Sequence, residues 1–173
     1  AYDHDDGGNV LRGLAYVAFQ ELATRISHRN TGRYSSDPVA DKIMARIAAD
    51  ENLHMVFYRD MLEEAMKVDP SAAVHAIADE VTDFQMPGAG MVNFTRKAAQ
   101  MAKAGIYDLR VHHDEVIWPL LRHWGVFEAE NLTPSAEARR MELRRFLDQL
   151  DAQASRFEAK RAASLERDAV RAR

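Results

Sequence analysis

Residues 38–67 read PVADKIMARIAADENLHMVFYRDMLEEAMK, a run that contains no glycine and has proline only at its first position. Asp37 precedes that proline, so the pair forms a helix N-cap followed by proline at the first helical position, where the missing N–H costs nothing. About 30 residues rising 1.5 Å each make a helix of about 45 Å, a length typical of helical bundles. This stretch therefore predicts one long helix and favours an all-α bundle.

The rest of the chain has similar helix start and stop signals. Asp69-Pro70 and Thr133-Pro134 repeat the cap-and-proline pattern, and Asn30-Thr31-Gly32 indicates a helix end. Hydrophobic periodicity predicts about six helices, at residues 9–29, 38–67, 70–85, 91–104, 108–124 and 134–167. Pro119 should kink the fifth helix. No run of alternating apolar and polar residues with hairpin turns suggests a β-sheet, so we expect one all-α domain over residues 1–173. The charged tail at residues 160–173 is expected to fray.

The composition narrows the possible functions. The 173 residues are 47% hydrophobic and 29% charged, with a net charge of −4 and no cysteine. The negative charge argues against nucleic acid as the main partner. The absence of cysteine excludes disulfides and thiolate metal sites, so any metal must rest on Glu, Asp and His. No apolar run approaches the roughly 18 residues of a membrane span, and there is no signal-peptide pattern, so a soluble, cytoplasmic protein is expected.

Two otherwise apolar helix faces are interrupted by polar residues that can bind metals. Steps of three and four residues give one face Val10, Leu14, Val17, Glu21, Thr24 and His28, and the other Ile43, Ile47, Glu51, His54, Tyr58 and Met61. A carboxylate on a buried face costs several kcal/mol unless it is paired or binds a metal. The carboxylate and imidazole of Glu51-x-x-His54 lie three residues apart on one helix face and can reach one ion.

Di-iron carboxylate bundles use a single Glu on each of two helices and Glu-x-x-His on each of two others. Glu21 and Glu51-x-x-His54 supply half of that set, and the sequence contains no second Glu-x-x-His. The pattern is therefore compatible with a metal site. The alternative interpretation is that these carboxylates form salt bridges, for instance with Arg25 or Arg46.

Other polar and aromatic groups are interpreted as structural. Adjacent residues on a helix point about 100° apart, so the four side chains of the rival cluster at 112–115 (His-His-Asp-Glu) cannot all meet one ion, and a solvated helix face is expected there. His28 and His75 are interpreted as helix-end residues. Trp118, Trp124 and Phe127 are expected in the core.

Two segments carry a resemblance to a known family. Residues 19–31 (FQELATRISHRNT), followed by residues 49–54 (ADENLH), resemble the soluble acyl-carrier-protein desaturases, with the actinobacterial (mycobacterial) branch nearest. Residues 84–87 (FQMP) and 105–107 (GIY) extend the resemblance, so that it covers essentially the whole chain. The resemblance implies a ferritin-like bundle that holds two iron ions.

The resemblance also implies roles for individual residues. Glu21 corresponds to a terminal iron ligand, Glu51 to a bridging carboxylate and His54 to a nitrogen ligand. Thr24 matches a hydroxyl near the oxygen-binding face that takes part in proton delivery, and Asp50 matches an acidic residue on the family's electron path. Positions lining the family's acyl tunnel correspond to Gly13, Tyr16, Pro87 and Phe94.

The chain also departs from the family pattern. The family has a further Glu and a Glu-Glu-Asn-Arg-His-like motif on two earlier helices, and neither is present here. The chain thus resembles the C-terminal half of a desaturase, with three of the six expected ligands, and the isolated chain is expected to be inactive. Two alternatives stay open: a ferroxidase or iron-storage protein whose di-iron site is completed across a homodimer, and a metal-free helical interaction module.

As a desaturase, the protein would introduce a cis double bond into a saturated acyl chain, using O₂ and two electrons from a ferredoxin-like donor. The expected partners are acyl carrier protein with its acyl chain, that donor, and a second copy in a homodimer. Acyl carrier protein is acidic, so docking needs a local basic surface. Arg96, Lys97 and Lys103 are the favoured surface because they lie near the tunnel residues, and Arg140 with Arg144 is the alternative.

Overall fold

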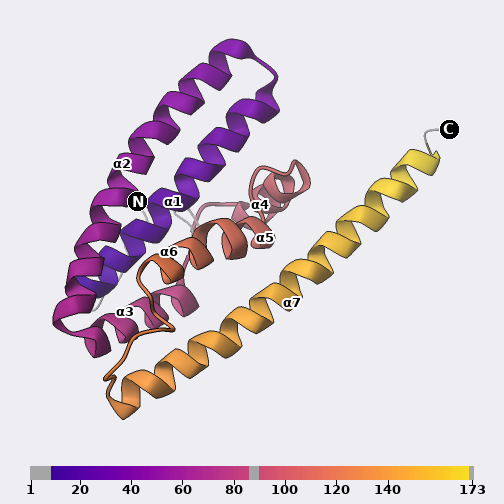
Figure 1. Ribbon diagram of the computed structural model, residues 1–173. Coiled ribbons are helices and arrows are strands. Elements are labelled where there is room, and N and C mark those ends of the chain that lie inside the picture. Colours follow the sequence, from indigo (N-terminus) through magenta and orange to yellow (C-terminus); the bar gives the residue numbers. More distant parts are fainter. Residues whose placement is uncertain (1–8, 86–89, 172–173) are drawn as a thin grey trace.

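The computed structural model describes residues 9–85 and 90–171, and within these ranges all regular structure is helical (Figure 1). The elements are α1 (Val10–Ser35), α2 (Pro38–Val68), α3 (Pro70–Asp83), α4 (Phe94–Lys103), α5 (Leu109–Val111), a π-helical turn (His112–Ile117), α6 (Trp118–His123) and α7 (Pro134–Arg171). Residues 109–123 form one continuous helical run, so the described residues contain six helical segments. The predicted all-α class is confirmed.

The helix starts follow from local capping. Asp37 Oδ1 accepts hydrogen bonds from the backbone N–H groups of Val39 (2.7 Å) and Ala40 (3.0 Å). Asp69 and Thr133 cap α3 and α7 in the same way through Ala72 and Ala136, at 2.9 and 3.3 Å. These side chains satisfy N–H groups that have no partner inside the helix. All three predicted cap-and-proline starts are therefore correct.

The predicted end of the first helix at Gly32 is wrong, because α1 continues to Ser35. Gly32 is buried where α1 and α2 approach each other near their connection. A Cβ atom at this position would lie 2.9 Å from both Asp41 Oδ1 and Met44 Cβ. The glycine therefore permits a close helix–helix contact and does not end the helix.

A π-helical turn precedes Pro119, where the sequence predicts a kink. Proline has no N–H, and its ring clashes with the carbonyl four residues earlier. Residues 112–117 widen to the π pattern, in which the N–H of Trp118 bonds to the carbonyl of His113, five residues back. The helical run therefore passes through the proline without a break.

The core lies between the α1–α2 pair, α3, α6 and α7. Figure 1 shows α1 and α2 as an antiparallel pair, α3 crossing below them, and α7 running along the other side. The largest fully buried apolar side chains are Phe19, Leu62, Ile77, Ile117, Leu120, Leu121, Leu143 and Leu147. Trp124 packs edge-on against Phe19 at 5.5 Å between ring centroids, which confirms its expected place in the core.

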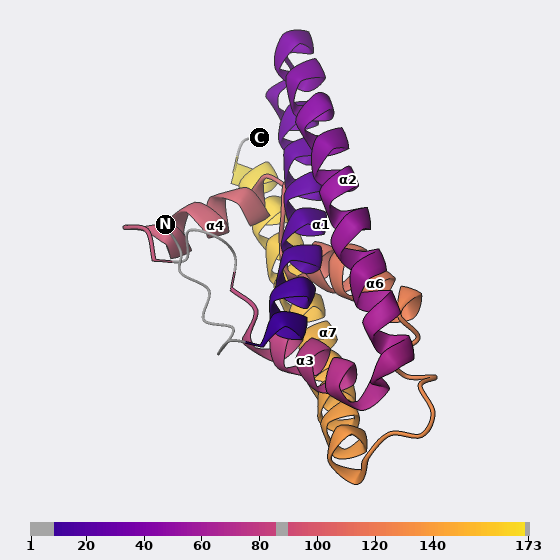
Figure 2. The same ribbon diagram turned by 90° about the vertical axis from the view of Figure 1, so that its left-hand side faces the viewer.

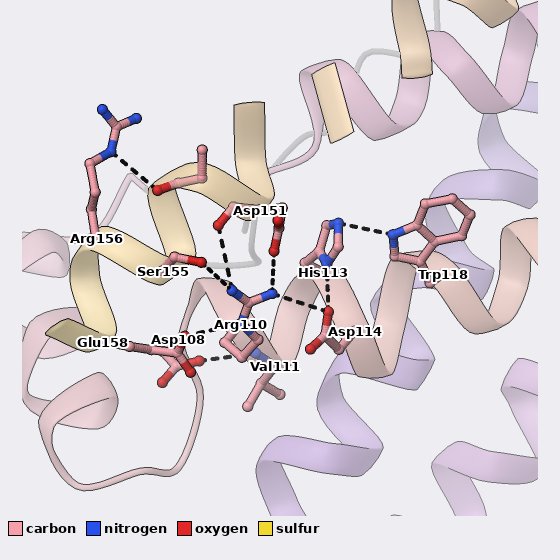
Figure 3. A network of polar contacts seen from close by, with 11 residues as sticks. Asp108, Arg110, Val111, His113, Asp114, Trp118, Asp151, Ser155, Arg156 and Glu158 are labelled. Carbon is pink, nitrogen blue, oxygen red and sulfur yellow. Dashed lines mark hydrogen bonds and ion pairs between the residues drawn. The ribbon is translucent and has the colours of Figure 1, made fainter. Parts of the chain in front are cut away.

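Arg110 ties α5 to the long helix α7 (Figure 3). Its Nη1 donates to Asp151 Oδ1 at 2.6 Å, and its Nη2 donates to Ser155 Oγ at 2.8 Å. Its Nε donates to Glu158 Oε2 at 3.2 Å. The helix continues to Arg171, beyond the predicted end at 167. The fraying expected at residues 160–173 stays a prediction.

The helix α4 is the least integrated part of the described chain, and Figure 2 shows it to one side of the α1–α2 pair. It is shorter than the predicted 91–104, and all but one of its residues keep some solvent exposure, Ala102 being buried. Its position leaves a groove beside the body of the protein, described below.

Candidate metal centre

The antiparallel packing of α1 on α2 brings the two interrupted faces together. His54 Nδ1 lies 3.3 Å from Glu21 Oε2 and 3.8 Å from Glu51 Oε2. One ligand atom from each of the three residues can be chosen so that all lie within 4.8 Å of one another. The sequence prediction that these three residues form one cluster agrees with this geometry.

The electrostatics of the cluster favour a cation. Burial, a hydrogen bond to Glu51 and repulsion from Glu51 together raise the pKa of Glu21 to about 7, whereas His54 acts in the opposite direction. Two half-buried carboxyl groups that face each other cannot both ionise without cost. A divalent cation among them would offset this repulsion, so the carboxylate and imidazole donors fit iron.

His28 lies beside the cluster, against Glu51, which the sequence interpretation missed. Its Nδ1 lies 3.7 Å from Glu51 Oε1, is buried, and makes no hydrogen bond. Because the first helix was predicted to end near Gly32, His28 was interpreted as a helix-end residue. It nevertheless lies on the same helix face as Glu21 and Thr24. A buried ring nitrogen without a partner beside a carboxylate is a second observation that fits a bound cation.

The salt-bridge alternative is not supported among the described residues. Arg46 pairs with Asp50 at 3.2 Å, and neither Arg25 nor Arg46 forms an ion pair with Glu21 or Glu51. Asp50, the expected electron-path residue, is therefore held by an arginine one turn earlier. The Thr24 hydroxyl lies 3.1 Å from the carbonyl oxygens of both Gln20 and Glu21, within its own helix.

A groove lies between α4 and the rest of the protein, and we call it the α4 groove. Its volume is about 560 Å³, and its walls are mainly apolar. Residues that line it include Phe84, Phe94, Ala98, Ala102, Tyr107 and Phe157. Of the expected tunnel residues, Phe94 lines the groove, and Tyr16 packs against its wall at 5.9 Å from the Phe84 ring. Gly13 lies on α1 one turn before Tyr16, and Pro87 is outside the described residues.

The basic residues of α4 are separated from this groove. Arg96, Lys97 and Lys103 are exposed and do not line it, whereas Phe94 and Ala98 do. On the alternative basic surface of α7, both arginines make contacts within the chain, although Arg144 stays exposed. Arg140 Nη1 donates to the carbonyl of Ala129 at 2.8 Å, and the Arg144 guanidinium lies 3.9 Å from the centre of the Phe127 ring.

The expectation of a solvated face at residues 112–115 is wrong for its two histidines. His113 is buried and accepts a hydrogen bond from Trp118 Nε1 at 2.9 Å (Figure 3). His112 lines the α4 groove and is stacked on Phe84. The π-helical turn changes which side chains face inward, and a 3.6-residue periodicity does not include that change.

A second group of possible ligands comprises Asp60, Glu63 and His123. His123 Nε2 lies 3.1 Å from Glu63 Oε2, but Asp60 is already paired with Arg59 at 2.7 Å. The side chains of Asp60, Glu63 and His123 are 51%, 39% and 32% exposed, so this group resembles an ordinary surface ion network.

Comparison with known proteins identifies the family. The fatty acid desaturase family model matches residues 2–172. The chain belongs to this desaturase family. The protein named acyl-[acyl-carrier-protein] desaturase DesA1 of Mycobacterium tuberculosis is 47% identical over 161 residues, which are 93% of this chain and 48% of DesA1. Stearoyl-[acyl-carrier-protein] 9-desaturase 3 of Arabidopsis thaliana is 34% identical over 142 residues, which are 76% of this chain and 35% of that protein.

This desaturase-family chain thus spans about half the length, or less, of these relatives. A solved structure described as acyl-ACP desaturase DesA2 of M. tuberculosis matches with a TM-score of 0.64 and 23% identity, over 80% of this chain and 53% of that one. The match confirms the predicted ferritin-like helical fold. No helix among the described residues is both long and apolar enough to cross a membrane.

Proposed function

We propose that this chain is the metal-binding and acyl-binding half of an acyl-carrier-protein desaturase. The observation that carries the proposal is the convergence of Glu21, Glu51 and His54 within 4.8 Å in a chain of the desaturase family. The reaction removes two hydrogens from adjacent CH₂ groups of a saturated acyl chain to form a cis double bond. O₂ is reduced to two molecules of water with those two hydrogens, two electrons from a ferredoxin-like donor and two protons.

Glu21, Glu51 and His54 would hold iron, with His28 beside Glu51. Bound iron would supply the oxidising power that an unactivated CH₂ requires. Two ions need more ligands than these three residues provide, and we propose that the rest come from residues outside this chain. Without metal, burial and Glu51 raise the pKa of the Glu21 carboxyl to about 7, and iron binding would displace the proton that it then holds.

The chain would position the substrate through the α4 groove. Its apolar walls suit a hydrocarbon chain, and Phe84 connects them to Tyr16 on α1, the helix that also carries Glu21. A displacement of about 1 Å can cost a hundredfold in rate, so a fixed apolar channel explains how one carbon pair is selected.

Arg96, Lys97 and Lys103 would contact the acidic carrier protein, and Asp50 would lie on the electron path. We also propose that the complete enzyme is a homodimer in the cytoplasm.

A chimera tests this function. The present chain replaces the matching half of DesA1, and the product is purified, loaded anaerobically with Fe(II) and supplied with acyl-carrier-protein substrate, donor and O₂. We expect an unsaturated acyl product from the chimera and none from the same chimera with His54→Ala. The matched control His75→Ala, on α3, should keep activity. A folded, iron-loaded chimera that forms no double bond would contradict the proposal.

A further inference from the structure

The α4 groove has a histidine among its mainly apolar walls. Its volume of about 560 Å³ is within the range of about 300–1,000 Å³ that is usual for small-molecule sites. Three phenylalanines and three alanines make up half of the residues that line it, and His112 lies among them. The His112 ring is stacked on Phe84, with 5.0 Å between centroids and 27° between planes, so its orientation is fixed.

The protonation of His112 follows from its surroundings. Burial, with a smaller contribution from His113, lowers the pKa of His112 to about 4, so the ring is neutral near pH 7. His112 Nδ1 lies 2.8 Å from the hydroxyl oxygen of Tyr107. That hydroxyl has no other hydrogen-bond acceptor among the described residues, so we assign its proton to this contact. Nδ1 is then the acceptor, and the ring proton is on Nε2.

The Nε2–H of His112 has no hydrogen-bond partner among residues 9–85 and 90–171. Solvent reaches this N–H in the open groove, and a ligand oxygen that displaces water there can accept its hydrogen bond. Asp108 also lines the groove, but its carboxylate accepts a hydrogen bond from the Val111 N–H at 3.0 Å and pairs with Arg161 at 3.7 Å. Because the His112 ring is neutral, it has no charge to attract an anion, and a neutral carbonyl oxygen fits as its acceptor.

We propose that His112 Nε2–H donates a hydrogen bond to the thioester carbonyl of the acyl substrate in the α4 groove, and so sets how far the chain enters. The proposal rests on the proposed function, in which this groove holds the acyl chain. Tyr107 is the positioning residue, because its hydroxyl fixes the tautomer that places the proton on Nε2. The family resemblance suggested Phe94 and Tyr16 as tunnel residues, but it did not suggest a polar anchor.

Two matched probes isolate the carbonyl. The first is the S-decanoyl thioester of N-acetylcysteamine, and the second is the S-decyl thioether, which lacks only the carbonyl. Their affinities for the 173-residue chain are measured by calorimetry, and the carbonyl stretch of the bound thioester is measured by infrared spectroscopy. The test variant is Tyr107→Phe/His112→Phe, because replacing both partners avoids leaving the buried tyrosine hydroxyl unpaired. The control is His75→Phe, whose Nε2 lies outside the groove, 3.2 Å from Ser135 Oγ.

We expect the thioester to bind about three- to tenfold more tightly than the thioether, which is the usual net effect of one neutral hydrogen bond. This preference should disappear in the double variant and persist in His75→Phe. The carbonyl stretch should lie at lower frequency in the wild-type complex than in alkane solvent. That second measurement does not depend on whether the variant folds.

An undiminished thioester preference in the double variant, or a wild-type carbonyl stretch equal to that in alkane, would overturn the role of His112 and leave the acyl groove intact. Failure of both probes to bind the wild-type chain would overturn the acyl groove itself. The two proposals therefore fail in different ways.

Discussion

Replacing Glu21 by Gln should make the metal-free protein more stable at alkaline pH. The Glu21 side chain is 13% exposed and faces Glu51, and its pKa rises from 4.5 to about 7 in the folded state. Between pH 4.5 and about pH 7, Glu21 therefore keeps its proton in the folded state but has lost it in the unfolded state. Wild-type stability falls as pH rises through this window, by at most about 3 kcal/mol for this one group. Gln keeps the shape and hydrogen-bonding capacity but has no charge, so this loss should be absent.

Urea unfolding of the metal-free chain at pH 5 and pH 8, with a chelator present, measures the effect. At pH 5 the Glu21→Gln variant should differ from the wild type by less than about 1 kcal/mol, and at pH 8 it should be more stable by about 1–3 kcal/mol. Burial also raises the pKa of Glu80 to about 7, so a parallel loss of stability remains in both proteins and cancels in the comparison. Glu64→Gln, an exposed glutamate paired with Lys67 on α2, should keep the wild-type pH slope. An unchanged pH slope in Glu21→Gln would refute the reasoning.

Two further predictions concern surfaces away from the metal cluster. Arg110→Ala should destabilise the chain by about 1–3 kcal/mol in urea unfolding, because it breaks several charge-assisted bonds between α5 and α7. Arg156→Ala, which loses only a bond to the Ala152 carbonyl of its own helix, is its control, and equal losses in the two variants would contradict the account. In the DesA1 chimera, Arg96→Glu/Lys97→Glu should raise KM for the acyl-carrier substrate several-fold at low ionic strength with iron content unchanged. Reversal of the exposed Arg156 and Lys160 should leave KM unchanged, and an unaltered KM in the α4 variant would reject that docking surface.

The sequence predicted most helices because their starts depend on local chemistry. Asp37, Asp69 and Thr133 each satisfy backbone N–H groups within three residues, so no tertiary information is needed. The pairing of Glu21 with Glu51-x-x-His54 was also predictable, because periodicity places these residues on the faces of two long helices.

Features that depend on tertiary packing were missed. Gly32 resembles a helix end in the sequence, and only the nearness of Asp41 and Met44 shows that it permits close packing. His28 was assigned to a helix end because the first helix was predicted to stop near Gly32. His112 and His113 were placed on a solvated face because a regular helical period was assumed, whereas the π-helical turn before Pro119 rotates them inward. The helix α4 makes few contacts with the other helices, and hydrophobic periodicity does not predict where such a helix lies.

Anaerobic Fe(II) titration of the purified chain tests the central claim most directly, because it measures affinity and proton release without requiring activity. We predict that Fe(II) binding at pH 6 releases protons, since Glu21 is then largely protonated, and that affinity rises with pH. Glu51→Gln and His54→Ala should each weaken binding at least tenfold, as loss of a ligand does, while His75→Ala binds normally. Equal Fe(II) affinity in the wild type and in the Glu21→Gln/Glu51→Gln/His54→Ala variant would contradict the assignment of this cluster as the metal centre.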